Sequence, residues 1–477
     1  MALLRVQMSF PLPSYNNEQT NAASQTPRFL SDYADFDANL AQIYYFFYCK
    51  LGRDMYNRCL LCIFLNFYYF STLRLGLFMN DSKKHALLLS EYSAVQVFYW
   101  MGYCCISSYA AVFLQNRGYT NTDLGMIIAI GNIGGFFLAP LLASFIDGSG
   151  KIKVHHCLYG LLFAEALLEV LILFSDGSGV YVSILYCILM ACTVAVGPMN
   201  TELCFSMDRT GQYINFGFSR SCGSLAFSII TIMLGKLCSE YSPELLSDLS
   251  IVTIAMELII LTIIQRVRKI VVSPDAGQSI EKKKEGSSLG EFLANNKRFV
   301  AFCIGTSVLM FPSSILGSFL INIAKNVGGN ESSMGIMSSI GAFCEVPAML
   351  FYTRITRNFK CSTVIRFAAV MYIVRIATVT FAANLGTLYL SAVTQMLCYA
   401  LIIPALVDYT SIVVDVNDSA KGQAVSAAML TLANITASIV GGVLMDKMGV
   451  HNTMLITLAV CVLGVIICFV TIDSKRA

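Results

Sequence analysis

The sequence predicts an all-α membrane protein, with twelve transmembrane helices arranged in two pseudo-symmetric six-helix bundles. Of the 477 residues, 56% are hydrophobic and 13% are charged, and the mean hydropathy is +0.67. A soluble domain is about 25% charged, so this chain is too apolar for that class. Apolar segments of spanning length and a repeat between the two halves also support the prediction. The basic residues are dispersed among short loops, which argues against nucleic-acid binding.

The first 78 residues differ from the rest of the chain. Residues 1–40 are polar and lack the basic region and short apolar core of a signal peptide. Residues 57–78 approach spanning length, but polar residues interrupt them. We expect residues 1–78 to be a disordered or non-native extension, and Met79 has the features of a native start ahead of the first span.

Beyond Met79, apolar runs of about 20 residues follow one another, which is the length that crosses roughly 30 Å of hydrocarbon. They centre near Gly102, Gly134, Ala166, Leu189, Ile229, Met256, Val308, Ala342, Val370, Tyr399, Asn434 and Val462. A polar linker, 268–296, separates the sixth run from the seventh. The sequence therefore predicts one bundle over 79–267 and a second over 297–477.

The two halves repeat at an offset of about 210 residues. The offset places Gly125, Ile130 and Gly131 on Gly335, Ile340 and Gly341. Parallel six-helix repeats are a transporter architecture, in which solute binds near the bilayer midplane between the halves.

The basic residues predict the orientation of the chain. If Met79 lies inside, the external loops contain only Arg117, Lys236, Lys325 and Lys447 among the basic residues of the short loops. Because cytoplasmic loops carry an excess of Lys and Arg, we expect a multi-pass protein of the cell membrane. Met79 and the C-terminus are then both cytoplasmic.

Two opposite charges lie just inside successive apolar segments, Glu202 before a polar turn and Arg220 after it. A charge in the hydrocarbon region costs about 2.5 to 3.5 kcal/mol on insertion scales, so such residues face a partner or a wet cavity. The pair either binds solute in a cavity or is a structural bridge between two helices. Trp100, with Tyr99 and Tyr103, either stacks on the solute or packs at an interface.

Two stretches resemble the major facilitator superfamily. The turn Ala143–Lys151 is similar to the signature G-x-x-x-D-R-x-G-K between helices 2 and 3, with Asp147, Gly150 and Lys151 retained as the conformational motif. Residues 215–224, Asn-Phe-Gly-Phe-Ser-Arg-Ser-Cys-Gly-Ser, resemble the start of helix 5 in the lactose permease and phenylpropionate transporter group. The resemblance covers residues 85–472.

This resemblance implies that the Glu202 and Arg220 positions face each other across the solute site. It adds Glu345 on the eighth helix and Arg375 on the ninth. Where lactose permease has a His and an acid that take part in proton coupling, this chain has Gln395 and Cys398. Lactose-type coupling is therefore not implied, and Gln395 becomes a candidate solute ligand.

Proton coupling would require a buried carboxylate that takes up and releases a proton during the cycle. Glu345 is the best placed candidate. Glu165 and Glu169 are four residues apart and so share a helical face, and Asp408 lies near the inner end of the tenth helix. The alternative for these last three is a paired structural role.

We therefore expect a secondary active transporter of a small solute, proton-coupled and working by alternating access. Sugars and oligosaccharides come first among the solutes, with nucleosides and aromatic acids as alternatives. A non-transporting membrane receptor is the rival from another class. No nucleotide-binding loop and no nucleophile beside a His occurs, so neither ATP-driven transport nor an enzyme is expected. We expect no metal or cofactor, and a monomer whose partners are solute, protons and lipid.

Overall fold

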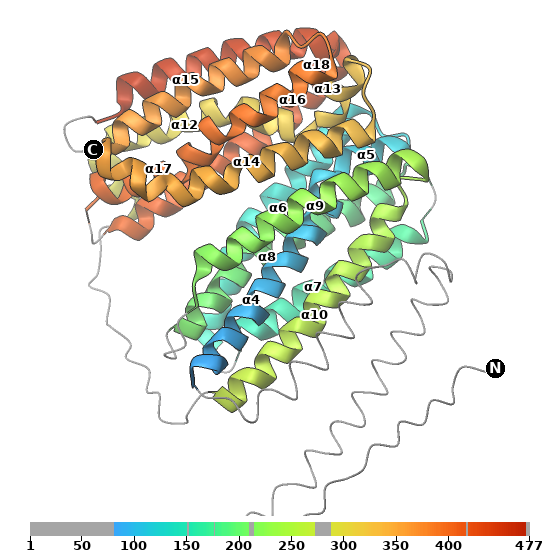
Figure 1. Ribbon diagram of the computed structural model, residues 1–477, viewed down its shortest axis with the longest axis vertical. Coiled ribbons are helices and arrows are strands. Elements are labelled where there is room, and N and C mark those ends of the chain that lie inside the picture. Colours follow the sequence, from blue (N-terminus) through green and yellow to red (C-terminus); the bar gives the residue numbers. More distant parts are fainter. Residues whose placement is uncertain are drawn as a thin grey trace, which may run out of the picture. The chain divides into compact units, whose positions relative to one another are not determined.

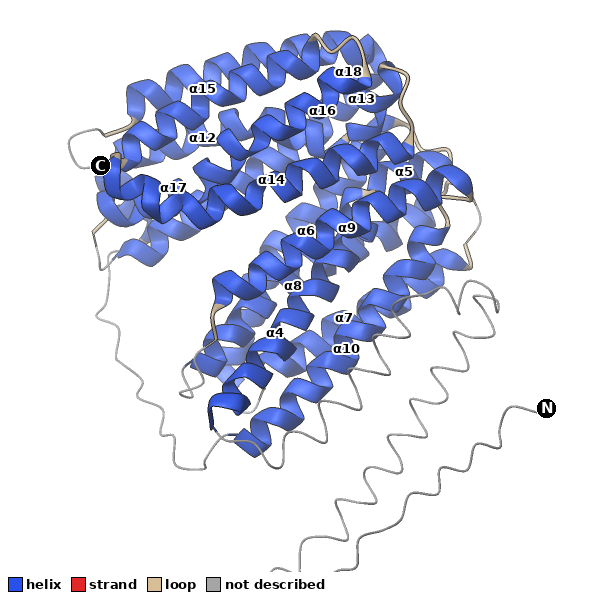
Figure 2. Cartoon of the chain, viewed as in Figure 1, coloured by secondary structure: helices blue, strands red, loops and turns tan. Residues whose placement is uncertain are grey.

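The computed structural model describes residues 81–149, 152–175, 177–208, 214–271, 288–415 and 418–473. Residues Phe78–Ala477 form one compact unit, and the regular structure of its described part is helical (Figure 2). The expected extension, 1–78, lies outside the described residues, as do Gly150, Lys151 and the middle of the linker.

The first bundle begins with a bent span. Helix α4 (Asp81–Tyr103) continues through a π-helical turn, η2 (Cys104–Ser108), into α5 (Ala110–Asn116), and the bend measures 44°. The bundle is completed by α6 (Asn121–Ser149), α7 (Val154–Leu173), α8 (Val180–Asp208), α9 (Phe216–Glu240) and α10 (Leu245–Val271).

The second bundle follows a short helix, α11 (Leu289–Asn295). Two of its spans are interrupted, the first being α12 (Lys297–Ser318) with α13 (Leu320–Asn326). The other is α16 (Leu385–Val393) with the 3₁₀ turn η3 (Thr394–Leu397) and α17 (Tyr399–Val413). The remaining helices are α14 (Glu331–Asn358), α15 (Cys361–Thr380) and α18 (Ser419–Thr471).

Helix α18 contains two predicted spans. At 53 residues it is about 80 Å long if straight, more than twice the hydrocarbon thickness. Gly449 breaks it with a φ of 75°, a left-handed conformation that glycine adopts without the steric cost a Cβ would bring. The chain therefore turns at Gly449, between the predicted eleventh and twelfth spans.

The predicted fold class is confirmed. Within the described residues, nine helices are long and apolar enough to cross a membrane, and the bent α4 and α5 pair makes a tenth. Helix α14 is not among them, and it carries four charged side chains along its 28 residues. Each of the twelve predicted centres falls in a described helix, with two of them in α18.

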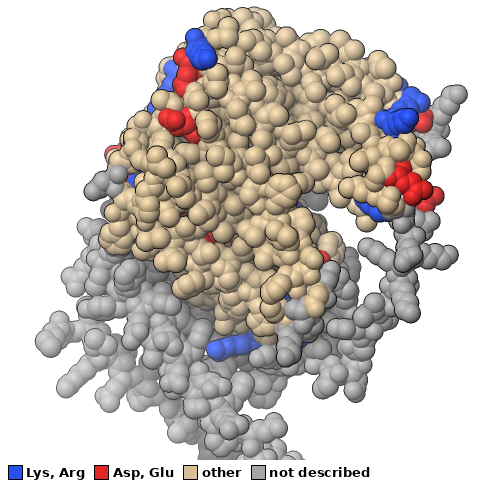
Figure 3. Space-filling model, turned by 180° about the vertical axis from the view of Figure 1, so that it is seen from behind, with Lys and Arg blue, Asp and Glu red and all other residues tan. Residues whose placement is uncertain are grey.

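The two bundles meet along two helix pairs, α9 against α14 and α6 against α18. In Figure 1 the orange and red helices of the second bundle lie together, apart from the blue and green helices of the first. Large apolar side chains face outward, among them Phe137, Phe163 and Ile466. Figure 3 shows charged side chains near the helix ends and uncharged surface between them. This distribution suits a lipid-facing belt.

Hydrogen bonds join the bundles at one end. Asn322 of α13 donates to Asn121 of α6 at 2.6 Å, and Asn330 donates to Ser239 of α9 at 3.0 Å. At the same end the Asp446 carboxylate of α18 accepts four hydrogen bonds from Asn121 and Thr122. Figure 3 shows a hollow between the bundles on the side away from these contacts.

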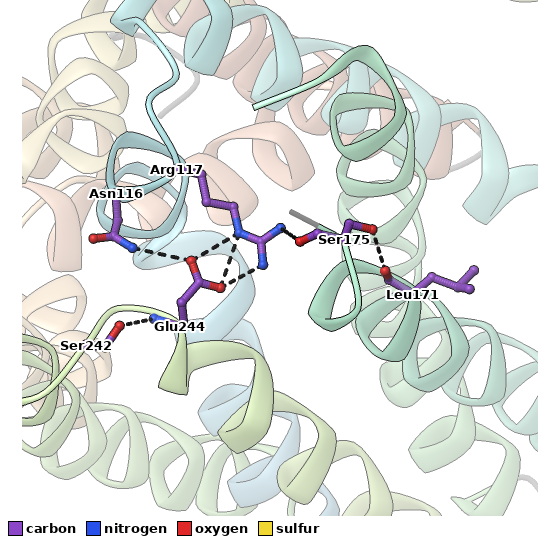
Figure 4. A network of polar contacts seen from close by, with 6 residues as sticks. All are labelled: Asn116, Arg117, Leu171, Ser175, Ser242 and Glu244. Carbon is purple, nitrogen blue, oxygen red and sulfur yellow. Dashed lines mark hydrogen bonds and ion pairs between the residues drawn. The ribbon is translucent and has the colours of Figure 1, made fainter. Parts of the chain in front are cut away.

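A second group of polar contacts ties the connections of the first bundle together at that same end (Figure 4). Arg117, after α5, forms a two-pronged ion pair with Glu244, with a closest distance of 2.7 Å. Its third nitrogen donates to the Ser175 carbonyl at 3.1 Å. The nearly buried guanidinium of Arg117 thus links three interhelical connections of the first bundle, because this planar group presents several hydrogen-bond donors at once.

Candidate functional site

Arg220 stands in the second turn of α9 and is oriented by α4. Its Cζ lies 3.9 Å from the centroid of the Trp100 ring, and one of its terminal nitrogens donates to Ser224 Oγ at 2.6 Å. A guanidinium over an indole is worth about 0.5 to 2 kcal/mol, more when desolvated. The guanidinium plane is therefore held by two helices of one bundle.

Trp100 fits beneath Arg220 because residue 223 is glycine. A Cβ on Gly223 would lie 2.5 Å from Trp100 Cδ1, closer than real Cβ contacts. Tyr103 and Phe227 complete an aromatic wall, with ring centroids 5.2 and 6.3 Å from that of Trp100. The buried indole N–H has no hydrogen-bond partner in the described part of the chain, so the wall includes an unused donor.

The second bundle contributes a chain of three polar side chains. Arg375 of α15 donates to Gln395 Oε1, and Gln395 Nε2 donates to Glu345 of α14. Gln395 lies in the 3₁₀ turn η3, which interrupts the span between α16 and α17. Such interruptions within membrane helices occur where the backbone is buried in protein or lines a cavity.

These two groups face each other across the bundle interface. Glu345 interacts electrostatically with both Arg220 and Arg375, and Tyr399 lies within electrostatic range of all three. We call Trp100, Arg220, Glu345, Arg375 and Gln395 the central cluster. The Gln395 amide joins Arg375 to Glu345, and with Arg220 the cluster offers hydrogen-bond donors and acceptors beside an aromatic surface.

Residues 89–456 match the MFS_1 like family. The chain belongs to this family. Over 377 residues it is 21% identical to YwbF, an uncharacterized transporter of Bacillus subtilis (strain 168), covering 77% of this chain and 90% of YwbF. The family assignment and the described apolar helices identify a multi-pass membrane transporter of the major facilitator type.

Solved structures share the fold of this MFS_1 like transporter. A mutant form of the nucleoside transporter NupG superposes with a TM-score of 0.66 at 15% identity, covering 81% of this chain and 98% of that one. A bacterial homologue of the human lysosomal transporter Spinster gives 0.58 at 11% identity, with coverages of 81% and 97%. At these identities the likeness concerns the fold alone.

In this MFS_1 like chain an acid of the other bundle, Glu345, lies within electrostatic range of Arg220. Glu202, on α8, is half-buried. The pairing of Glu202 with Arg220 that the resemblance to the lactose permease group implies stays a prediction. Glu345 comes within electrostatic range of Arg220 because α14 packs directly against α9.

Other predicted residues lie away from the central cluster. Asp408 is 13 residues beyond Gln395, about 20 Å along a helix, and accepts a hydrogen bond from Tyr352 at 2.7 Å. Glu165 and Glu169 lie inside the first bundle, each 3% exposed. Asp147 belongs to α6, and its side chain is outside the described set.

Sequence reasoning missed three buried polar residues and a tyrosine. Glu91 and Glu257 are 0% and 3% exposed, and Asn200 is 1% exposed. Tyr399 lies within electrostatic range of Glu345, Arg220 and Arg375. The signal for the two acids was present, because both lie in apolar segments where charge is costly, the same observation that singled out Glu202.

Proposed function

We propose that this transporter binds a small polar solute at the central cluster, between the two bundles, and moves it by alternating access with a proton as coupling ion. The proposal rests on the electrostatic interaction of Arg220 in the first bundle with Glu345 in the second. A solute bound there would touch both bundles, which is what alternating access requires.

The chemistry of the cluster favours a sugar or oligosaccharide. Sugar hydroxyls both donate and accept, and the cluster offers guanidinium donors, a carboxylate acceptor and the amide of Gln395. The apolar face of a sugar ring can lie on Trp100 and Tyr103. We propose Glu202 as a further ligand that approaches the solute in another state of the cycle.

A nucleoside is the second candidate, because the same aromatic wall can stack on a base. The fold likeness to the nucleoside transporter NupG is consistent with this alternative. Aromatic acids fit the two guanidiniums by charge. A non-transporting receptor would need only the binding step.

We assign proton coupling to Glu345. Protonating this carboxyl would remove the negative charge that faces Arg220 and free that guanidinium for solute. We further propose that Met79 and the C-terminus are cytoplasmic, that the chain works as a monomer, and that Asp147, Gly150 and Lys151 act in the conformational change. The hollow between the bundles would then open to the cytoplasm.

A ligand screen followed by transport in liposomes tests the proposal. Purified protein is first screened by thermal shift against sugars, nucleosides and aromatic acids, and the best ligand is then used in uptake assays. Glu345→Gln should abolish accumulation driven by a pH gradient while solute exchange continues. The matched control is Glu331→Gln on the same helix, since Glu331 pairs with Lys325 at 3.0 Å at the helix start.

Accumulation by Glu345→Gln equal to that of the wild type would exclude Glu345 as the proton carrier. Binding without any transport would favour the receptor alternative. A thermal shift by none of the three solute classes would contradict the proposed solute range.

A further inference from the structure

A second polar cluster lies inside the first bundle. Glu165 of α7, Asn200 of α8 and Glu257 of α10 are 3%, 1% and 3% exposed. Asn200 Nδ2 donates to Glu257 Oε1 at 2.8 Å, and Glu165 interacts electrostatically with Glu257. Three helices thus bring two carboxyls and one amide together away from solvent.

The cluster of Glu165, Asn200 and Glu257 has more hydrogen-bond acceptors than donors. Asn200 Oδ1 and Glu165 Oε1 are both buried without a hydrogen-bond partner in the described part of the chain. Thr193 lies against Glu165, but its hydroxyl already donates to the Leu189 carbonyl at 2.9 Å. A hydroxyl carries one proton, so Thr193 can donate to the Leu189 carbonyl or to Glu165, but not to both at once.

The described groups that interact most strongly with Glu165 carry no positive charge. Glu165 faces Glu169 on its own helix, Cys192 on α8 and Tyr99 on α4, in addition to Glu257. None of these side chains is cationic. Two carboxyls buried within electrostatic range of each other cannot both ionise without compensation, because an unpaired charge in a dry interior is the costly state.

Asn200 Oδ1 has no hydrogen-bond partner in the described part of the chain, and this second observation does not depend on the two acids. Asn200 is held by its bond to Glu257, so its carboxamide is fixed at the cluster, and the Tyr92 hydroxyl donates to its backbone carbonyl at 3.0 Å. Buried polar oxygens are normally paired. The fixed and unpaired oxygen of Asn200 therefore indicates that a hydrogen-bond donor or a cation binds there. Oxygen ligands of this kind suit hard cations.

We propose that Glu165, Asn200 and Glu257 form a monovalent-cation site that takes up one proton or one sodium ion. Either would add the single positive charge that two neighbouring carboxyls need. Tyr99 lies in electrostatic range of Glu165, Glu257 and Arg220, so the site adjoins the central cluster through one side chain. Cation binding itself stands apart from the proposed transport function, and only its role as a coupling ion rests on that function.

Cation binding can be measured on the purified protein without transport. Two signals are recorded, the melting temperature while sodium replaces choline at fixed pH, and the infrared band of protonated carboxyls as pH is varied. Glu165→Gln and Glu257→Gln should each weaken the response about tenfold or abolish it. The matched control is Glu240→Gln on α9 of the same bundle, which removes a carboxylate that pairs with Lys236 at 3.7 Å and should keep the response.

The two signals distinguish the ions. A sodium-dependent rise in melting temperature that Glu257→Gln removes identifies sodium, whereas a carboxyl band that the same variant removes, without a sodium response, identifies the proton. Asn200→Ala keeps both carboxyls and should weaken either response, which preserves the test if a glutamine variant does not fold.

The inference is overturned if the wild type gives neither signal, or if both signals survive in Glu165→Gln and Glu257→Gln. Solute-induced thermal shifts are recorded on the same samples. A solute response without a cation response contradicts only this inference, and a cation response without any solute response contradicts only the proposed function.

Discussion

Replacing Asp446 by Ala should loosen the end at which the bundles are joined. The Asp446 carboxylate accepts from the backbone N–H groups of Asn121 and Thr122 at 3.2 and 2.7 Å. It also accepts from their side chains at 2.8 and 2.6 Å. Since α6 begins at Asn121, a residue of α18 acts as the N-cap of a helix in the other bundle.

The expected size of the effect follows from these contacts. Removing an N-capping side chain costs about 0.5 to 2 kcal/mol, and a carboxylate near a helix N-terminus adds about 0.3 to 1 kcal/mol. Asp446 is solvent-exposed, which keeps the total near the lower part of the combined range. A loss of about 1 to 2 kcal/mol shifts a two-state equilibrium about 5- to 30-fold.

The shift can be measured as a distance distribution between spin labels on the two bundles. Labels at Phe174 and Phe381, both exposed and at the joined end, report separation in a background whose accessible cysteines are replaced. Asp446→Ala should increase the separated population. Asp123→Ala is the control, because Asp123 accepts only from Thr120 of its own connection among its described bonds. Equal distributions in Asp446→Ala and the wild type would refute the reasoning.

Three further substitutions test individual contacts of the described residues. Arg220→Lys should lose nearly as much solute binding as Arg220→Ala, because an ammonium lacks the planar fork that stacks on Trp100; binding close to wild type by calorimetry would contradict this. Gly223→Val should displace the Trp100 ring and abolish binding in a folded protein, whereas unchanged indole fluorescence would show that the ring had not moved. Arg117→Lys should reduce thermal stability by about 1.5 to 3 kcal/mol, since it loses charged hydrogen bonds; a melting temperature within about 1 °C of wild type would falsify it.

The sequence by itself determined the class, the spans and the transporter resemblance. The thickness of the hydrocarbon core sets the length of each apolar run. That length can be counted directly in the sequence. For this reason even Gly449, where α18 turns, could be anticipated as a break between the predicted centres at Asn434 and Val462. Glu345, Arg375 and Gln395 were singled out by family resemblance.

Only the tertiary structure decided which side chains meet. Each residue along a helix turns by about 100°, so a small uncertainty in helix rotation changes the neighbour that a charge faces. Glu345 lies within electrostatic range of Arg220 because α14 and α9 pack across the interface. The bond of Asn200 to Glu257 and the capping of α6 by Asp446 likewise join residues 57 and more than 300 positions apart. Such contacts cannot be predicted from sequence spacing, because they depend on how whole helices are arranged in space.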